Sequence, residues 1–254
     1  MASNRYEEIF EVNAHMTDAD GICRASEVLR LLQEAANRQL EHRGPTEADL
    51  RAQGRAFLLS RISVSILRPL RAYEKVVTAS WPCPSSRGFS FDRNYALDLL
   101  APDGSRTPAA CAVSQWALIG TADRKLLRVE DGGVDYVHDE AVSAALPLRF
   151  RIPRDAVLTE VGRKEILYSD ADKNRHMNNT HYPDLYCDRL PMEGRRVSAF
   201  SVAFLSEAPL GDVLSVERTA SPDADGVYYF RTRRLSDGAV NTEAMVKLTE
   251  PERG

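Results

Sequence analysis

The sequence contains no apolar run that approaches the roughly 20 residues needed to cross a bilayer as a helix. Its first segment, Met1 to Glu11, is polar and charged and lacks the apolar stretch of a secretory signal. The 33 basic residues nearly balance the 37 acidic ones, so a formal charge of -4 gives no global reason to bind nucleic acid or an anionic membrane. We expect a cytoplasmic protein without a membrane span.

Cysteine is also scarce. The four residues, Cys23, Cys83, Cys111 and Cys187, form no CxxC pair and have no histidine at metal-ligand spacing. This pattern indicates reduced, mostly packed thiols, and we expect neither a metal nor a cofactor. The 254 residues, 43% of them hydrophobic, suffice for one large domain or two small ones.

A polar run between Tyr168 and Asn179 contains the densest set of reactive side chains. Asp172, Asn174 and His176 are two residues apart, so an extended segment projects all three to one side. One face then presents a carboxylate, an amide and an imidazole, which is typical of a catalytic site. The alternative is a surface turn in which aspartate and asparagine bind their own backbone.

The same run resembles the start of a calcium-binding EF-hand loop. Asp170, Asp172 and Asn174 occupy its first three ligand positions. The loop needs a glycine where this chain has Arg175, and a bidentate glutamate where it has His181. Calcium binding is therefore not predicted.

The chain contains an internal repeat. Residues 18–21 match residues 170–173 at an offset of 152, and a helical pattern follows each match. In the first copy we expect Ser26 to cap a helix that ends before Gly44. In the second copy the helix should begin near Asn179 or Thr180 and be shorter.

An alternating strand follows each helix, at residues 62–66 in the first copy and 200–204 in the second, now at an offset of 138. This offset persists through three strand-like segments, in the pairs Glu74 and Asp212, Gly88 and Gly226, and Arg93 and Arg231. Each half then has a strand, a helix and several antiparallel strands, an α+β unit. We predict a tandem (double) hotdog with halves at 1–130 and 148–254, joined by a connection at 131–147.

The motif Asp172-x-Asn174-x-His176-Met177-Asn178-Asn179 resembles that of the plant and bacterial acyl-acyl-carrier-protein thioesterases. Further similar segments are Leu31–Ala36, Ser114–Ile119 and Asp188-x-Leu190-Pro191. The resemblance implies a double hotdog that hydrolyses the thioester of fatty acyl-acyl carrier protein and releases free fatty acid. It makes the acyl carrier protein the expected partner, and it implies that the first half supplies the acyl pocket.

The family also has a glutamate-cysteine pair about thirty residues after the histidine, and that position here is Glu207-Ala208. Because Ala208 replaces the cysteine, a thiol nucleophile is not available at this position. The resemblance therefore implies hydrolysis by water and a carboxylate. Other departures from the family pattern are Met177, Gly120 and Phe57.

We assign four catalytic residues. Glu207 is the base that holds the attacking water, and Asn174 positions the thioester carbonyl or the water. Asp172 and His176 are expected to form a hydrogen-bonded pair, with Asp172 as direct nucleophile left open. Backbone amides near residues 178–180 are the expected oxyanion donors.

The repeat offers a check on this assignment, because chemistry need occur in one half only. The offsets place Asp20 opposite Asp172, Ile22 opposite Asn174, Arg24 opposite His176 and Pro69 opposite Glu207. Three of the four functional groups are then absent from the first half, which favours a catalytic role in the second.

Three other functions are compatible with the sequence. An acyl-CoA thioesterase or a hotdog hydratase uses similar groups on a thioester, and a non-catalytic sensor could bind the same acyl chain. A homodimer is compatible with the fold. An acidic carrier protein requires a local basic surface. The candidates are Arg61, Arg68, Arg71, Lys75, Arg195, Arg196, Arg231, Arg233 and Arg234.

Overall fold

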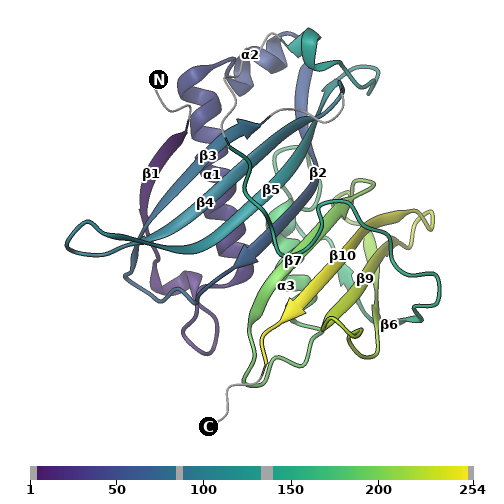
Figure 1. Cartoon of the computed structure of the whole chain (residues 1–254). Coiled ribbons are helices and arrows are strands. Elements are labelled where there is room, and N and C mark those ends of the chain that lie inside the picture. Colours follow the sequence, from purple (N-terminus) through teal and green to yellow (C-terminus); the bar gives the residue numbers. More distant parts are fainter. Residues whose placement is uncertain (1–4, 84–87, 133–139, 251–254) are drawn as a thin grey trace. The chain divides into compact units, whose positions relative to one another are not determined.

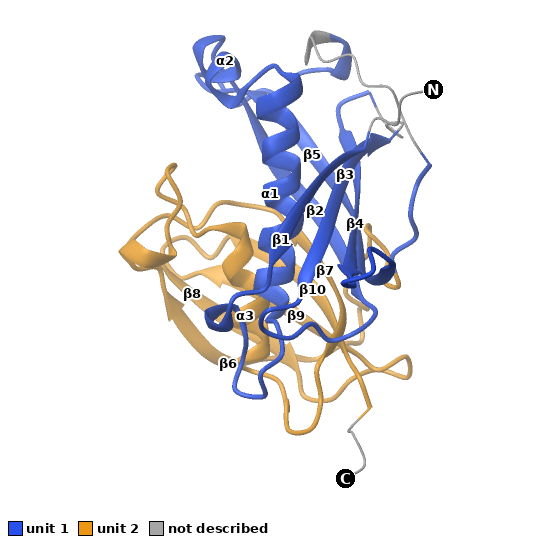
Figure 2. Ribbon diagram, turned by 90° about the vertical axis from the view of Figure 1, so that its left-hand side faces the viewer, with its two compact units in different colours: residues 1–144 blue, residues 145–254 orange. Residues whose placement is uncertain are grey.

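The computed structural model describes residues 5–83, 88–132 and 140–250 (Figure 1). The chain divides into two compact units, residues 1–144 and 145–254, coloured separately in Figure 2. The expected connection at 131–147 lies partly outside the described residues, at 133–139. Within the described part of the chain, no helix has both the length and the apolar character to cross a membrane.

Unit 1 is an antiparallel sheet of five strands, in the order β1-β3-β4-β5-β2, with one long helix. Its elements are β1 (Tyr6–Glu11), η1 (Ala14–Met16), α1 (Ala25–Arg43), α2 (Glu47–Ala52), β2 (Arg55–Ile66), β3 (Lys75–Cys83), β4 (Phe91–Leu100), β5 (Arg106–Gly120) and η2 (Val129–Gly132). Helix α1 packs against β1, β3 and β4 and lies along the sheet in Figure 2.

Helix α1 buries the face that its apolar spacing predicts. Leu29 and Leu32 are completely buried, and burying a leucine side chain contributes about 1.5–3 kcal/mol. The helix ends at Gly44, as predicted, with the positive φ of 57° that suits glycine at a helix end. The predicted cap was wrong: Arg24 is the N-cap, and Ser26 lies buried within the first turn.

Unit 2 has a second antiparallel five-stranded sheet, in the order β7-β10-β9-β8-β6, and a much shorter helix. Its elements are β6 (Leu158–Glu165), η3 (Tyr168–Asp170), η4 (Asn179–His181), α3 (Tyr182–Cys187), β7 (Val197–Phe204), β8 (Val213–Thr219), β9 (Val227–Arg234) and β10 (Val240–Leu248). The helical segment begins at Asn179, which confirms the sequence prediction.

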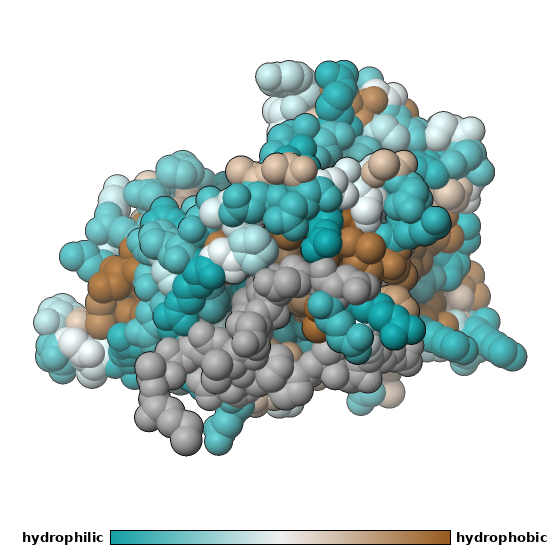
Figure 3. All heavy atoms as spheres, turned by 90° about the horizontal axis from the view of Figure 1, so that it is seen from above, coloured by the Kyte–Doolittle hydropathy of each residue, from teal (hydrophilic) through white to brown (hydrophobic). Residues whose placement is uncertain are grey.

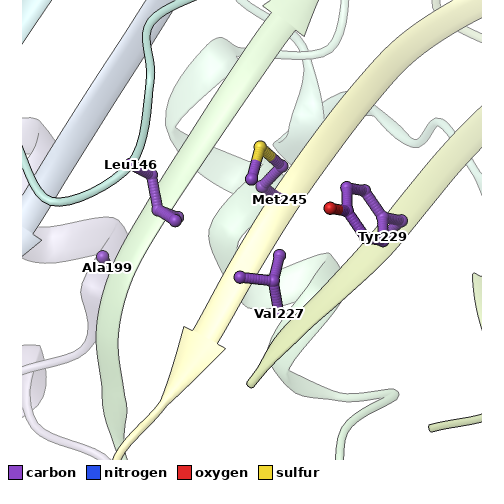
Figure 4. Close-up of a cluster of buried hydrophobic side chains, with 5 residues drawn as sticks. All are labelled: Leu146, Ala199, Val227, Tyr229 and Met245. Carbon is purple, nitrogen blue, oxygen red and sulfur yellow. The ribbon is translucent and has the colours of Figure 1, made fainter. Parts of the chain in front are cut away.

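The two faces of the unit 2 sheet are covered differently. On one face the ring of Tyr186, from α3, lies 4.8 Å from that of Phe230. The opposite face carries a cluster of Leu146, Ala199, Val227, Tyr229 and Met245 (Figure 4). Successive side chains of a strand point to opposite faces of the sheet, so the neighbours Tyr229 and Phe230 in β9 are buried on opposite faces. Figure 3 shows the whole chain from above, and the described residues on that side are mostly hydrophilic, with smaller hydrophobic groups among them.

Equivalent backbone bonds confirm the repeat. The amide of Val12 donates to the carbonyl of Glu74 over 2.9 Å, and the amide of Ile166 donates to that of Asp212 over 2.9 Å. The strands keep the predicted offset of 138, which relates Glu74 to Asp212. Val12 and Ile166, however, are 154 residues apart, two more than the predicted offset for the segment before the helix.

The same correction applies to the polar run. In unit 1 the Asp18 carboxylate accepts bonds from the amides of Asp20 (2.9 Å) and Ile22 (3.0 Å). The Asp172 carboxylate accepts the same two bonds from residues two and four positions later. The matching Asp-Ala-Asp strings suggested the wrong register. They align Asp20 with Asp172, but the aspartate that accepts the two amide bonds in unit 1 is Asp18. The equivalent pairs are Asp18 and Asp172, Asp20 and Asn174, Gly21 and Arg175, and Ile22 and His176.

Candidate active site

The site residues Asp172 to His176 form a tight turn, not the extended segment expected. The Asp172 carboxylate accepts from the amides of Asn174 (2.8 Å) and His176 (3.2 Å), and its own amide donates to the His176 carbonyl (2.8 Å). A short aspartate side chain competes for local backbone amides in this way. The side-chain amide of Asn174 also donates to Asp172, over 3.3 Å. Asp172 therefore organises the turn that presents Asn174 and His176.

The imidazole of His176 lies beside Glu207, with 3.4 Å between Nε2 and Oε2. The expected side-chain pair between Asp172 and His176 is thus wrong: the carboxylate binds the His176 backbone, and the imidazole faces Glu207 instead. The amide of Met177 donates to the Ala208 carbonyl (2.8 Å) and joins the two segments. The structure places His176 beside Glu207, and Asn174 lies two residues before His176 in the same turn. The catalytic roles of these residues stay predictions.

Two residues that the sequence did not assign to the site, Arg234 and Asn241, hold the backbone of Ser206 and Glu207, just before β8. Arg234, from β9, donates through Nη1 to the Glu207 carbonyl over 2.7 Å and also pairs with Asp237. Asn241, from β10, donates to the carbonyl of Ser206. Arg234 was expected to contact a partner, whereas its position fixes the backbone of Glu207. Asn241 is followed in β10 by the polar residues Thr242 and Glu243, so no signal in the sequence singled it out.

The backbone amides at the helix start are mostly engaged. The amide of Asn178 donates to the Asp170 carbonyl (2.9 Å), and that of Thr180 donates to the Asn178 side chain (3.0 Å). The side chain of Asn178 is therefore the helix cap. Of the three expected oxyanion donors, only the amide of Asn179 has no acceptor within the described residues.

A second charged cluster lies directly before the turn. Asp170 is 7% exposed and lies 2.7 Å from Lys164 Nζ and 3.6 Å from His181 Nδ1. Burial alone raises the pKa of Asp170, but bonds from Lys164 and from the Leu167 amide outweigh it and leave the pKa below its ordinary value. This cluster is confined to unit 2. The equivalent positions in unit 1 are Phe10, Met16 and Glu27.

Lys164→Met should lower the free energy of unfolding by about 2 kcal/mol at pH 7, because it leaves the buried Asp170 carboxylate without its main partner. A depressed pKa contributes stability above the ordinary carboxyl pKa, and this contribution disappears as the pH falls through the folded value. The difference in the free energy of unfolding between Lys164→Met and wild type should therefore become smaller as the pH falls from 5 to 3. Urea unfolding across this range measures it.

Lys125→Met is the matched control, because Lys125 pairs with Asp123 on the surface, with side chains 78% and 52% exposed. Such a pair contributes little, so its loss should change stability by less than about 0.5 kcal/mol. An undiminished deficit for Lys164→Met at pH 3 would show that lost packing, and not the Asp170 charge, is responsible.

Three of the four cysteines are poorly suited to nucleophilic attack. Burial raises the pKa of the Cys23 thiol to about 12, and burial also raises the pKa values of Cys83 and Cys111. None of the four cysteines forms a disulfide bond within the described residues. In the parts of the chain that the structure covers, no three His, Cys, Asp or Glu side chains are grouped to hold a metal ion.

Unit 1 contains an apolar pocket. Its wall includes the aromatic side chains of Phe57, Phe91 and Trp116, with Leu40 from α1 and the polar residues Asp92 and Arg93 at strand β4. The rings of Phe57 and Phe91 meet edge to face, with 4.9 Å between centroids. Trp116 belongs to the segment Ser114–Ile119 that resembles the family, and it lines this pocket together with Phe91.

Comparison with protein families identifies one match. The model described as the acyl-ACP thioesterase N-terminal domain matches residues 3–137, which is more than half of the chain. This match covers most of unit 1, whereas the candidate site lies in unit 2. A comparison with curated proteins gave no match.

Solved structures resemble the whole chain. An acyl-ACP thioesterase from Bacteroides thetaiotaomicron has a TM-score of 0.83 and 24% identity, covering 97% of this chain and 98% of its own. The 12:0-ACP thioesterase from Umbellularia californica has a TM-score of 0.80 and 17% identity, covering 98% of each chain. A putative oleoyl thioesterase from Lactobacillus plantarum has a TM-score of 0.76 and 18% identity, covering 98% and 97%. These matches confirm the predicted tandem hotdog fold.

Proposed function

The chain belongs to the acyl-ACP thioesterase family, and we propose that the turn at Asp172 to His176, together with Glu207, is its hydrolytic site. The enzyme hydrolyses the thioester of fatty acyl-acyl carrier protein and releases free fatty acid. The observation that supports this location is the contact between His176 and Glu207, with Asn174 in the same turn as His176. The equivalent positions in unit 1 are Ile22 and Pro69, which cannot do this chemistry.

In the proposed reaction, Glu207 accepts a proton from water while the water oxygen attacks the thioester carbon. The Nδ2 group of Asn174 donates to the carbonyl oxygen as negative charge develops on it, and the amide of Asn179 is a second candidate donor. The carbon–sulfur bond then breaks. The thiol product has a pKa near 8.5, so it departs readily as thiolate and is protonated afterwards.

Asp172 acts in this scheme as a positioning residue. Its carboxylate already accepts three bonds, from the amides of Asn174 and His176 and from the Asn174 side chain. Asp18 forms the same turn in unit 1, where the imidazole and the glutamate are absent. A residue that both copies use for the same backbone turn serves the fold, which argues against Asp172 as direct nucleophile.

We further propose a division of labour between residues 1–130 and 148–254. The first segment contains the apolar pocket lined by Phe57, Phe91 and Trp116, which suits an acyl chain. The second contains the hydrolytic groups. A cytoplasmic location, a role in ending chain elongation in fatty acid biosynthesis, and a homodimer remain proposals that accompany this function.

Release of free thiol from acyl thioesters tests the function against its rivals. Purified protein is mixed with acyl carrier protein and with coenzyme A, each loaded with the same saturated or 2,3-unsaturated acyl chain. A carrier-protein thioesterase releases thiol and fatty acid in equal amounts and prefers the carrier protein in kcat/KM. Preference for coenzyme A, hydration of the double bond without thiol release, or binding without turnover would instead indicate the acyl-CoA thioesterase, the hydratase or the sensor.

Removal of the thiols should leave the reaction largely intact. Cys23→Ala and Cys187→Ala, and wild type treated with iodoacetamide, should each retain at least about half of kcat, because water is the nucleophile in this scheme. Stoichiometric inactivation at one cysteine, prevented by substrate, would overturn the water mechanism. Initial rates with peptide mapping of the alkylated residue make this measurement.

A further inference from the structure

Arg175 has a backbone conformation that its residue type disfavours. Its φ is 63°, in the left-handed region, where a side chain with a Cβ is strained. Two backbone bonds hold it there: its amide donates to the Asp172 carbonyl (2.9 Å), and its carbonyl accepts from the Leu210 amide (2.8 Å). The equivalent residue of unit 1 is Gly21, with a φ of 72° and the same type of bond to Asp18. The fold therefore makes this turn with glycine in one copy and with arginine in the other.

The Arg175 side chain has a distinct environment. It is exposed, it lies between Asn174 and His176 in sequence, and no carboxylate of the described residues pairs with it. Several basic residues that the sequence suggested for docking are instead neutralised within their own unit. These pairs are Arg68 with Glu74, Arg231 with Glu243, Arg233 with Glu217, and Arg234 with Asp237.

We infer that Arg175 is a docking contact for the acidic surface of the acyl carrier protein, placed at the mouth of the hydrolytic site. This inference rests on the proposed function. A guanidinium binds carboxylates through two parallel hydrogen bonds, which suits an acidic protein surface. The strained backbone directs this cation outward next to Asn174 and His176. A contact there helps to deliver the thioester, attached to the carrier by its flexible arm, into the site.

Arg175→Gly tests the inference, because Gly21 shows that glycine fits this turn. The melting temperature should rise by about 2 °C as backbone strain is relieved. At low salt, kcat/KM for acyl carrier protein should fall about 5- to 10-fold, and this loss should shrink as salt screens the contact. The loss should exceed, by at least about 5-fold, any loss with the same acyl chain on coenzyme A or on neutral N-acetylcysteamine.

Three further variants separate charge from backbone effects. Arg175→Asn tolerates the left-handed region without charge and should show the same selective loss. Arg175→Lys should keep most of the carrier-protein rate, and Arg175→Glu should lose more than Arg175→Gly. Gly21→Ala is the matched strain control, and it should lower the melting temperature without selective loss on the carrier protein.

Each other outcome contradicts the inference. Equal losses on all three substrates would place Arg175 in the reaction itself. Losses on acyl carrier protein and coenzyme A, with none on N-acetylcysteamine, would assign it to a phosphate of the prosthetic arm. A lower melting temperature for Arg175→Gly would show that the arginine stabilises the turn. Failure of the wild-type enzyme to release thiol from any substrate would contradict the proposed function instead.

Discussion

Replacing Glu207 by glutamine lowers kcat for thioester hydrolysis by at least ~10²-fold in our account, because glutamine keeps the shape of the side chain but cannot accept the proton of the attacking water. The fold should persist. Glu207 is partly exposed, its side chain at 35%, and its backbone is held by Arg234 through the carbonyl, which the substitution leaves in place. Steady-state thiol release and thermal unfolding measure the two effects.

Glu217→Gln is the matched control. Glu217 is a glutamate of the same unit, on β8, in an ion pair with Arg233. Its replacement should leave kcat within about twofold of wild type, since a partly exposed ion pair contributes little. Near-normal turnover of Glu207→Gln, with full substrate binding, would remove Glu207 as the base.

Asn174→Asp should lower kcat by a similar factor of at least ~10², and the repeat makes this change informative. Asp20 occupies the equivalent position in the equivalent turn of unit 1, so an aspartate is compatible with this backbone. The variant removes the Nδ2 donor and places a negative charge where the carbonyl oxygen becomes negative. Loss of a single donor to a developing oxyanion typically reduces kcat by about 10²- to 10³-fold.

Asp20→Asn is the reciprocal control in unit 1. It should retain wild-type kcat, because the neighbouring Ile22 and Pro69 supply neither an imidazole nor a carboxylate. A loss in Asp20→Asn as large as that in Asn174→Asp would indicate that both substitutions act through the fold. A retained rate in Asn174→Asp would exclude the amide as an essential donor.

The elements of the fold could be predicted because their signals are local. The alternation around Val64 and Val202, the helix end at Gly44 and the helix start at Asn179 depend on side-chain spacing and backbone conformation. The helix cap could not be assigned in the same way. Ser26 has the residue type of a cap, yet the chain turns at Arg24, whose amide donates to the Met16 carbonyl over 3.0 Å.

The residues of the proposed site were chosen from the sequence, but the contacts among them could not be predicted from it. Asn174, His176 and Glu207 were identified from their order and from the family motif. The partner of the His176 imidazole depends on how closely the segment that contains Glu207 approaches the turn. This distance is set by the tertiary fold and cannot be predicted from local sequence patterns. The role of Asp172 changed for the same reason, because its carboxylate binds the amides of its own turn.

The register of the repeat shows how letter matches can mislead. Two Asp-Ala-Asp strings suggested that Asp20 and Asp172 are equivalent, whereas the hydrogen bonds pair Asp18 with Asp172. The correction places Gly21, which also has a positive φ, opposite Arg175. The conclusion that unit 1 lacks the imidazole and the glutamate holds in either register.

A single turnover in oxygen-18 water, with enzyme in excess over acyl carrier protein substrate, tests most directly the claim that Glu207 activates water for attack on the thioester. The account predicts one solvent oxygen in each released fatty acid and no label in peptides that contain Asp172 or Glu207. Incorporation of the label into either carboxylate would show that the side chain itself attacked the thioester, and would contradict the account.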